Sequence, residues 1–155
     1  MEHAHSHETA SLNRVALQAT WHCLTGCALG EILGLVFASA LGLGNGASIA
    51  LASVLAFAFG YSFTLRPLLE AGVPARKAGR LALASDTLSI GTMEIVDNAF
   101  VLIVPGAMAA TLGDFLFWWS LAVSLGIAFL AAFPVNRYLI ARGRGHAVVH
   151  EFHQH

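Results

Sequence analysis

A histidine, two cysteines and a glutamate occur together inside a long apolar segment near the start of the chain: His22, Cys23, Cys27 and Glu31. The two cysteines and the glutamate recur every four residues, which on a helix with about 100° per residue places them on one face. Thiolate and imidazole groups bind copper and zinc, and carboxylates bind harder ions. We therefore expect these residues to contact a metal ion. The alternative is that the thiols only pack as small apolar groups.

A second polar stripe lies in the third apolar segment. Asp86, Met93 and Asp97 recur there at helical spacing, flanked by Glu94 and Asn98. Acids in a membrane helix need a shared polar interior, because each costs about 2.5–3.5 kcal/mol on insertion scales. We expect this stripe to face the first one, so that Met93 adds a soft ligand and the other four residues form an ion or proton path. The alternative is a static hydrogen-bond network that fixes helix packing.

Composition indicates that the bilayer is the solvent of this chain. Hydrophobic residues make up 57% and charged residues only 11% of the 155 residues, whereas soluble proteins carry roughly 25% charged residues. Backbone groups in lipid must be satisfied within each segment, so the apolar stretches are expected to be helices. We predict an all-α membrane protein, a bundle of four transmembrane helices within residues 15–141. The helices are expected near residues 15–41, 47–69, 81–104 and 115–140.

The distribution of Lys and Arg favours one orientation. These residues lie before the first segment, around the second connection and after the fourth segment, and the other two connections contain none. The positive-inside rule therefore predicts that both termini, residues 1–14 and 142–155, are cytoplasmic tails. Histidine-rich tails are typical of metal capture, with a solvated, disordered tail as the alternative. The tail histidines are His3, His5, His7, His146, His150, His153 and His155.

Glycine recurs every four residues in the first segment, at Gly26, Gly30 and Gly34. This pattern of small residues lets the backbone of another helix approach closely. A single chain of four helices forms a narrow bundle, so we expect a homo-oligomer. The glycines are a candidate surface for that contact between copies.

Three motifs resemble a known family. They are Trp21-His22-Cys23-x3-Cys27-x3-Glu31, Pro105-Gly106-Ala107-Met108, and the run from Phe133-Pro134-Val135-Asn136-Arg137 to Gly145-His146-Ala147. The chain resembles the small bacterial membrane proteins grouped as domain of unknown function 4396. The resemblance extends from the first helix to the C-terminal tail. It implies a four-helix protein of the bacterial inner (plasma) membrane, and it implies no activity.

The residues favour a small metal-handling membrane protein rather than an enzyme. We expect it to bind or translocate copper or zinc through an interior lined by thiol, imidazole and carboxylate groups. The sequence contains no ATP-binding loop, so no nucleotide is expected. A net charge of −1 gives no indication of a nucleic-acid partner. Two alternatives remain: a membrane redox or cofactor-binding module, and an accessory subunit of a larger membrane metalloprotein without transport activity.

Overall fold

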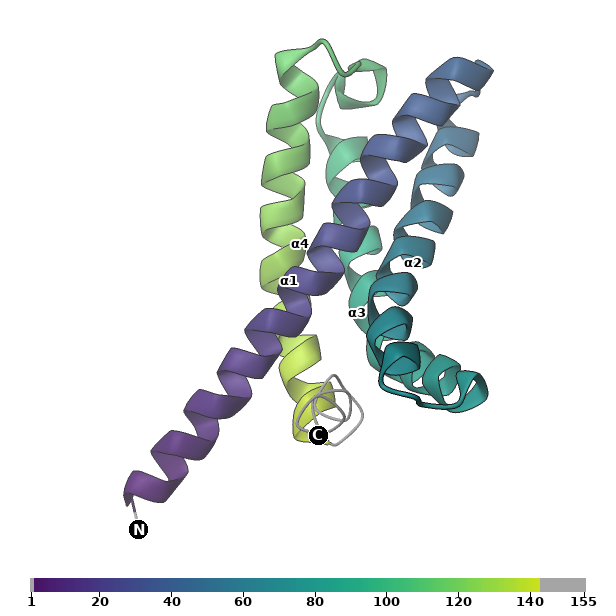
Figure 1. The fold of residues 1–155 in the computed structure, drawn as a ribbon. Helices are drawn as coiled ribbons and strands as arrows, with labels where there is room; N and C mark the ends of the chain where they lie inside the picture. Colours follow the sequence, from purple (N-terminus) through teal and green to yellow (C-terminus); the bar gives the residue numbers. More distant parts are fainter. Residues whose placement is uncertain (1, 143–155) are drawn as a thin grey trace.

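The computed structural model describes the backbone of residues 2–142 and the side chains of residues 11–142. Within that part of the chain there are long helices, one short 3-10 helix and no strands, which confirms the all-α prediction (Figure 1). Neighbouring helices run in opposite directions, so the first and third run in the same direction. The elements are α1 (Glu2–Leu41), α2 (Asn45–Glu70), α3 (Ala75–Ile103), η1 (Ala107–Ala109) and α4 (Phe115–Ala141).

The observed helices match the predicted segments closely except at the starts of α3, which begins at Ala75 rather than near residue 81, and of α1. This helix begins at Glu2 rather than near residue 15, because neither glycine nor proline interrupts the chain before Gly26. The backbone of the expected N-terminal tail therefore continues α1. Three tail histidines lie on the described backbone, but their side chains are outside the described part: His3, His5 and His7. The four C-terminal histidines lie entirely outside the described residues: His146, His150, His153 and His155.

Three stretches of helix are long and apolar enough to cross a membrane, and they indicate a membrane protein. They are Ser11–Leu41, Asn45–Glu70 and Phe115–Ala141. The remaining long helix, α3, has 29 residues and is amphipathic. Its acidic side chains Asp86, Glu94 and Asp97 are buried inside the bundle. Large apolar side chains of α3 are exposed on the outside, among them Leu83, Leu88, Ile95 and Leu102.

The glycine face of α1 packs against α2 of the same chain. A Cβ atom built on Gly26 would lie 2.9 Å from the Cα of Gly60, and one built on Gly34 would lie 2.5 Å from the Cα of Ala52. A Cβ on Gly30 would collide with the backbone of Ala56. The glycines therefore permit the close approach of a helix, as their spacing predicted. The idea that they serve a contact between copies is wrong, because α2 already covers them.

Helix α4 closes the bundle on the other side of α1. Asn136 Nδ2 donates a hydrogen bond to Thr20 Oγ1 at 2.9 Å, and both side chains are buried. Near the end of α4, Arg137 Nε donates to Asn13 Oδ1 at 2.7 Å. These bonds fix α4 along the first half of α1. Together with the glycine contacts on α2, they hold α1 with one constant face toward α3.

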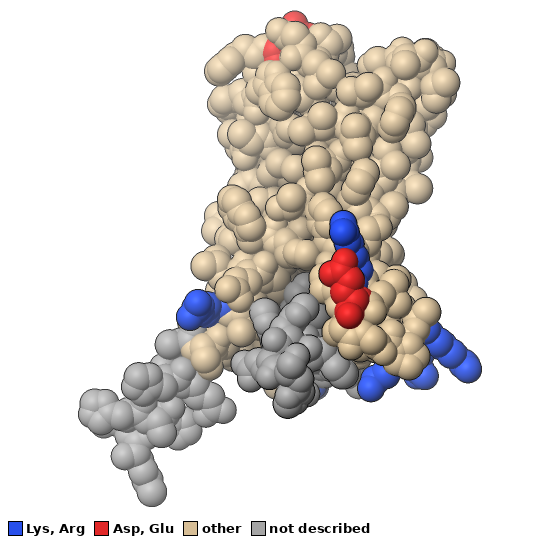
Figure 2. Space-filling model, viewed as in Figure 1, with Lys and Arg blue, Asp and Glu red and all other residues tan. Residues whose placement is uncertain are grey.

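Charged side chains gather at the two ends of the bundle. On the face shown in Figure 2, Lys and Arg lie at the end that carries the α2–α3 connection. At the opposite end, the charged side-chain atoms that are visible on this face are acidic. The acid there is Asp114, whose Oδ2 accepts hydrogen bonds from the Thr111 backbone N at 2.7 Å and from Thr111 Oγ1 at 2.8 Å. These bonds to the ionised form lower the pKa of Asp114 below its usual value. We refer to the two ends as the basic end and the acidic end.

Candidate functional site

The two polar stripes predicted from the sequence face each other inside the bundle. Because α1 and α3 run in the same direction, residues of α1 meet partners on α3 in successive contacts from the basic end to the acidic end. We call this set the polar seam. Its contacts are Cys23 with Ser89, Cys27 with Met93 and Glu94, and Glu31 with Asp97, and at the basic end His22 interacts electrostatically with Asp86.

Sulfur atoms occupy the middle of the polar seam. The Cys27 thiol donates a weak hydrogen bond to Met93 Sδ, with 3.9 Å between the two sulfur atoms. Cys23 belongs to the same buried cluster, which also contains Ile90, and the cluster is otherwise apolar. Cys23 and Cys27 are each 1% exposed, Met93 is fully buried, and both cysteines are free thiols. The centre of the seam is therefore a buried group of soft donor atoms, with Ser89 and Glu94 beside it.

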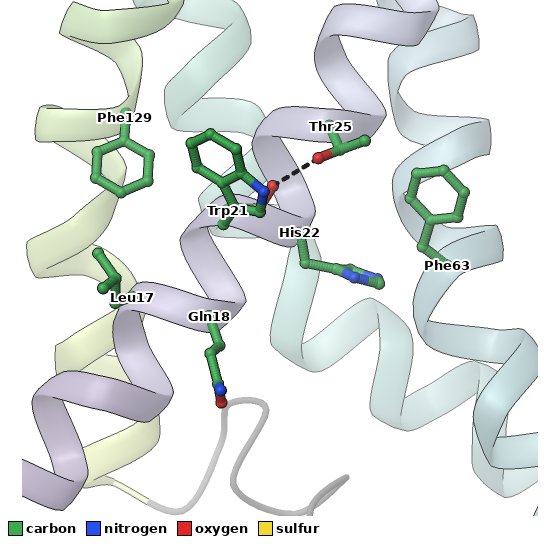
Figure 3. A pocket seen from close by; sticks show the side chains of 7 residues that line it. All are labelled: Leu17, Gln18, Trp21, His22, Thr25, Phe63 and Phe129. Carbon is green, nitrogen blue, oxygen red and sulfur yellow. Dashed lines mark hydrogen bonds between the residues drawn. The ribbon is translucent and has the colours of Figure 1, made fainter.

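At the basic end the seam reaches the outer surface through His22. Its ring packs edge-on against Phe63 of α2, with 5.3 Å between ring centroids, and it interacts electrostatically with Asp86. His22 also lines a groove of about 700 Å³ on the outer side of α1. Figure 3 shows the His22 ring extending toward α2, while Trp21 lies on the side of Phe129 of α4. An imidazole thus connects this groove with the buried acid of α3.

At the acidic end the seam opens into a cavity of about 130 Å³. Glu31 and Asp97 are in side-chain hydrogen-bond contact at its base. Asn98 Nδ2 lies 3.5 Å from Glu94 Oε2 and 3.4 Å from Ser53 Oγ of α2. Asp97 is 5% exposed, and its Oδ1 has no hydrogen-bond partner. Asp97 therefore lines the cavity, and one of its carboxyl oxygen atoms is buried without a hydrogen-bond partner among the described residues.

The comparison with protein families covers this whole site. The family model described as a domain of unknown function, DUF4396, matches residues 12–145. The chain belongs to the DUF4396 family. This confirms the resemblance noted in the three sequence motifs. No curated protein and no solved structure matches the chain.

In this DUF4396 protein the predicted metal ligands of α1 are spread along the helix. A rise of 1.5 Å per residue separates His22 from Glu31 by about 14 Å along the axis, so each residue meets a different part of α3. Among the side chains of residues 11–142, no three His, Cys, Asp or Glu residues gather into a group that could hold a metal ion. The closest soft pairing that the structure brings together is Cys27 with Met93.

Several hydroxyl groups of the site were not singled out by the sequence analysis. Thr64 of α2 contacts Asp86, Ser53 of α2 contacts Glu94, and Ser120 of α4 lines the cavity. A hydroxyl in an apolar helix commonly bonds to a carbonyl of the preceding turn, as Ser120 does to the Phe117 oxygen at 3.0 Å. Such residues therefore give no distinct functional signal in a sequence. Only the packing of α2 and α4 shows which acids they approach.

Proposed function

We propose that this DUF4396 protein binds Cu(I) at the centre of the polar seam and conducts it between the two ends of the bundle. The observation that carries the proposal is the 3.9 Å contact between Cys27 Sγ and Met93 Sδ. Thiolate and thioether are soft ligands and select Cu(I). Cys23 lies in the same buried cluster, and we propose that its sulfur atom is a third ligand of the ion.

The donor set favours copper over zinc. Zinc is usually held by four ligands drawn from Cys, His, Asp and Glu, whereas a methionine thioether is a typical ligand of Cu(I). Binding requires deprotonated thiols, so uptake of the ion would release protons. A monovalent ion paired with a single thiolate is electrically neutral, which lowers the cost of burying the ion in the bundle.

The two ends of the seam supply the rest of the path. His22 lines the groove at the basic end, and we propose that it passes the ion to Cys23 and Cys27. The acids Asp86, Glu94 and Asp97, together with Asn98 and Glu31, would carry protons or the ion through the remaining depth. The histidine tails at both ends of the chain would collect the ion at the basic end.

We also propose that α3 is a fourth transmembrane helix, with both termini in the cytoplasm of a bacterial inner membrane. The support is that its acids are buried while Leu88, Ile95 and Leu102 are each more than half exposed on its outer side. An apolar outer face suits lipid, and a polar inner face needs protein around it. The basic end would face the cytoplasm according to the positive-inside rule.

A competition titration with Cu(I) tests the proposed site. The full-length protein in detergent, kept anaerobic and reduced, competes for Cu(I) with a chromogenic chelator, and Cys27→Ser is compared with Thr25→Ser on the exposed side of α1. We expect Cys27→Ser to lose one tightly bound Cu(I) per chain, and Thr25→Ser to bind like the unsubstituted protein. Equal stoichiometry and affinity in all three proteins would overturn the proposal.

A further inference from the structure

The cavity at the acidic end is a second place where the structure suggests a ligand. It is lined by residues of α1, α2, α3, η1 and α4, it is partly open to the outside, and its volume is about 130 Å³. Its lining contains two acids, Glu31 and Asp97, and the polar side chains of Asn45, Ser48, Asn98 and Ser120. Its other walls are largely apolar, including Leu35, Ile49, Val101, Phe117 and Leu121. The cavity therefore combines a pair of carboxyl groups with largely apolar walls. The proposed copper site at the sulfur atoms does not explain why two acids are placed here.

Asp97, which lines this cavity, has one carboxyl oxygen without a hydrogen-bond donor among the described residues. Asp97 is 95% buried as a residue, since only 5% is exposed, and its Oδ1 accepts no hydrogen bond. A buried acceptor without a donor costs about 1–3 kcal/mol, and more when the group is charged. A ligand that donates hydrogen bonds and carries positive charge would remove that cost.

We infer that this cavity binds a small organic cation with a primary ammonium group. The ammonium has three N–H donors, which suit the oxygen atoms of Glu31 and Asp97 and a third polar neighbour. A short aliphatic chain would occupy the apolar walls. An apolar protein cavity of about 150 Å³ accommodates benzene, so a chamber slightly smaller than that holds roughly five non-hydrogen atoms. n-Butylammonium has this size and charge.

The inference does not rest on the proposed copper site, because that site uses sulfur atoms at a different depth of the bundle, whereas Glu31 and Asp97 enter the proposed function only as part of the ion or proton path. A primary ammonium can come from a free amine or from a phosphatidylethanolamine headgroup, since both carry the same group. The cavity lies beside the α1–α2 turn and η1, at the end of the helices, where either source is available. In a detergent that contains no amine, binding of an added free amine and binding of added phosphatidylethanolamine can be measured separately.

Calorimetric titration of the full-length protein in a maltoside detergent with n-butylammonium chloride tests the inference. We expect one site per chain, at least tenfold weaker binding in Asp97→Asn and in Glu31→Gln, and no binding of n-butanol, which lacks the charge. Ala110→Leu fills the cavity without changing any charge. It is expected to abolish amine binding and to leave Cu(I) binding unchanged, which also separates this inference from the proposed function.

Three results would overturn the inference. The first is no heat of binding with n-butylammonium. The second is that Asp97→Asn and Ala110→Leu bind the amine as tightly as the unsubstituted protein does. The third is displacement of the amine by Na⁺ or K⁺ at the same concentration. If Asp97→Asn does not fold, Glu31→Gln and Ala110→Leu decide the question. Displacement of the amine by added phosphatidylethanolamine, but not by phosphatidylglycerol, would support the inference and identify the headgroup as the source.

Discussion

Cys27 of α1 and Met93 of α3 face each other across the centre of the bundle, with their sulfur atoms 3.9 Å apart. Neither side chain is more than 1% exposed, and the other members of their buried cluster are Cys23, Ile90 and three alanines. Packing alone would be satisfied by two aliphatic side chains here. Substitutions of this pair can therefore distinguish two interpretations of the seam, a structural core and a site for a soft metal ion.

Met93→Leu distinguishes these accounts. Exchange of methionine for leucine conserves volume and usually costs less than about 1.5 kcal/mol of stability, so we expect the variant to fold. Because it removes a thioether ligand, Cu(I) affinity should fall at least tenfold, which is about 1.4 kcal/mol. Met108→Leu is the matched control, since Met108 lines the cavity rather than the sulfur centre. A loss of affinity of the same size in both variants would contradict the role of Met93.

The close contact between α1 and α2 predicts a strong effect of Gly30→Ala. The new Cβ would collide with the backbone of Ala56, and overpacking of this kind costs typically 1–3 kcal/mol. The melting temperature in detergent should therefore fall clearly. Gly126→Ala on α4 is the control, because nothing lies within 4 Å of its added Cβ and alanine favours helix. Equal melting temperatures of the two variants would show that α1 does not depend on this contact.

The loop before α4 predicts a pH-dependent contribution from Asp114. Its hydrogen bonds with Thr111 lower its pKa in the folded state, so its contribution to stability is present above the unfolded pKa, about 4. That contribution is lost as the pH falls through the folded-state value. Asp114→Asn should therefore melt below the unsubstituted protein at pH 7, and the difference should shrink below about pH 4. A difference that stays constant from pH 7 to pH 3 would contradict this.

The proposed orientation predicts which turns can be labelled from outside the cell. In a Cys23→Ser, Cys27→Ser background, Gly44→Cys places a thiol in the α1–α2 turn, where an added Cβ meets nothing within 4 Å. Ala75→Cys places one at the start of α3, at the basic end. A membrane-impermeant maleimide should label the Gly44→Cys variant on intact cells and the Ala75→Cys variant only after permeabilisation. The reverse pattern would refute the orientation.

The main features of the seam could be predicted from helical spacing. The period of Cys23, Cys27 and Glu31 places them on one face, and an even number of intervening reversals makes α1 and α3 parallel. The sequence did not determine which α3 residue each would meet. Glu31 contacts Asp97 because α1 crosses the bundle obliquely (Figure 1), and that crossing depends on how closely the glycines approach α2.

Other features had no adequate signal in the sequence. A pattern of small residues predicts that some helix approaches, but it does not say which one, so the contact of Gly30 with Ala56 could not be assigned to α2 or to a second copy. The cavity at Asp97 arises where two connections and all the long helices meet. No single segment encodes such a space, and only the assembled bundle shows it.

X-ray absorption at the copper edge of the Cu(I)-loaded protein tests the central claim most directly. The chain has three methionines, Met1, Met93 and Met108, so selenomethionine incorporation in a Met108→Leu background leaves Met93 as the selenium inside the bundle. The proposed site predicts sulfur neighbours and one selenium neighbour of copper, with the selenium signal lost in Met93→Leu. Copper surrounded only by nitrogen or oxygen, or a selenium signal that persists in Met93→Leu, would contradict the proposed site.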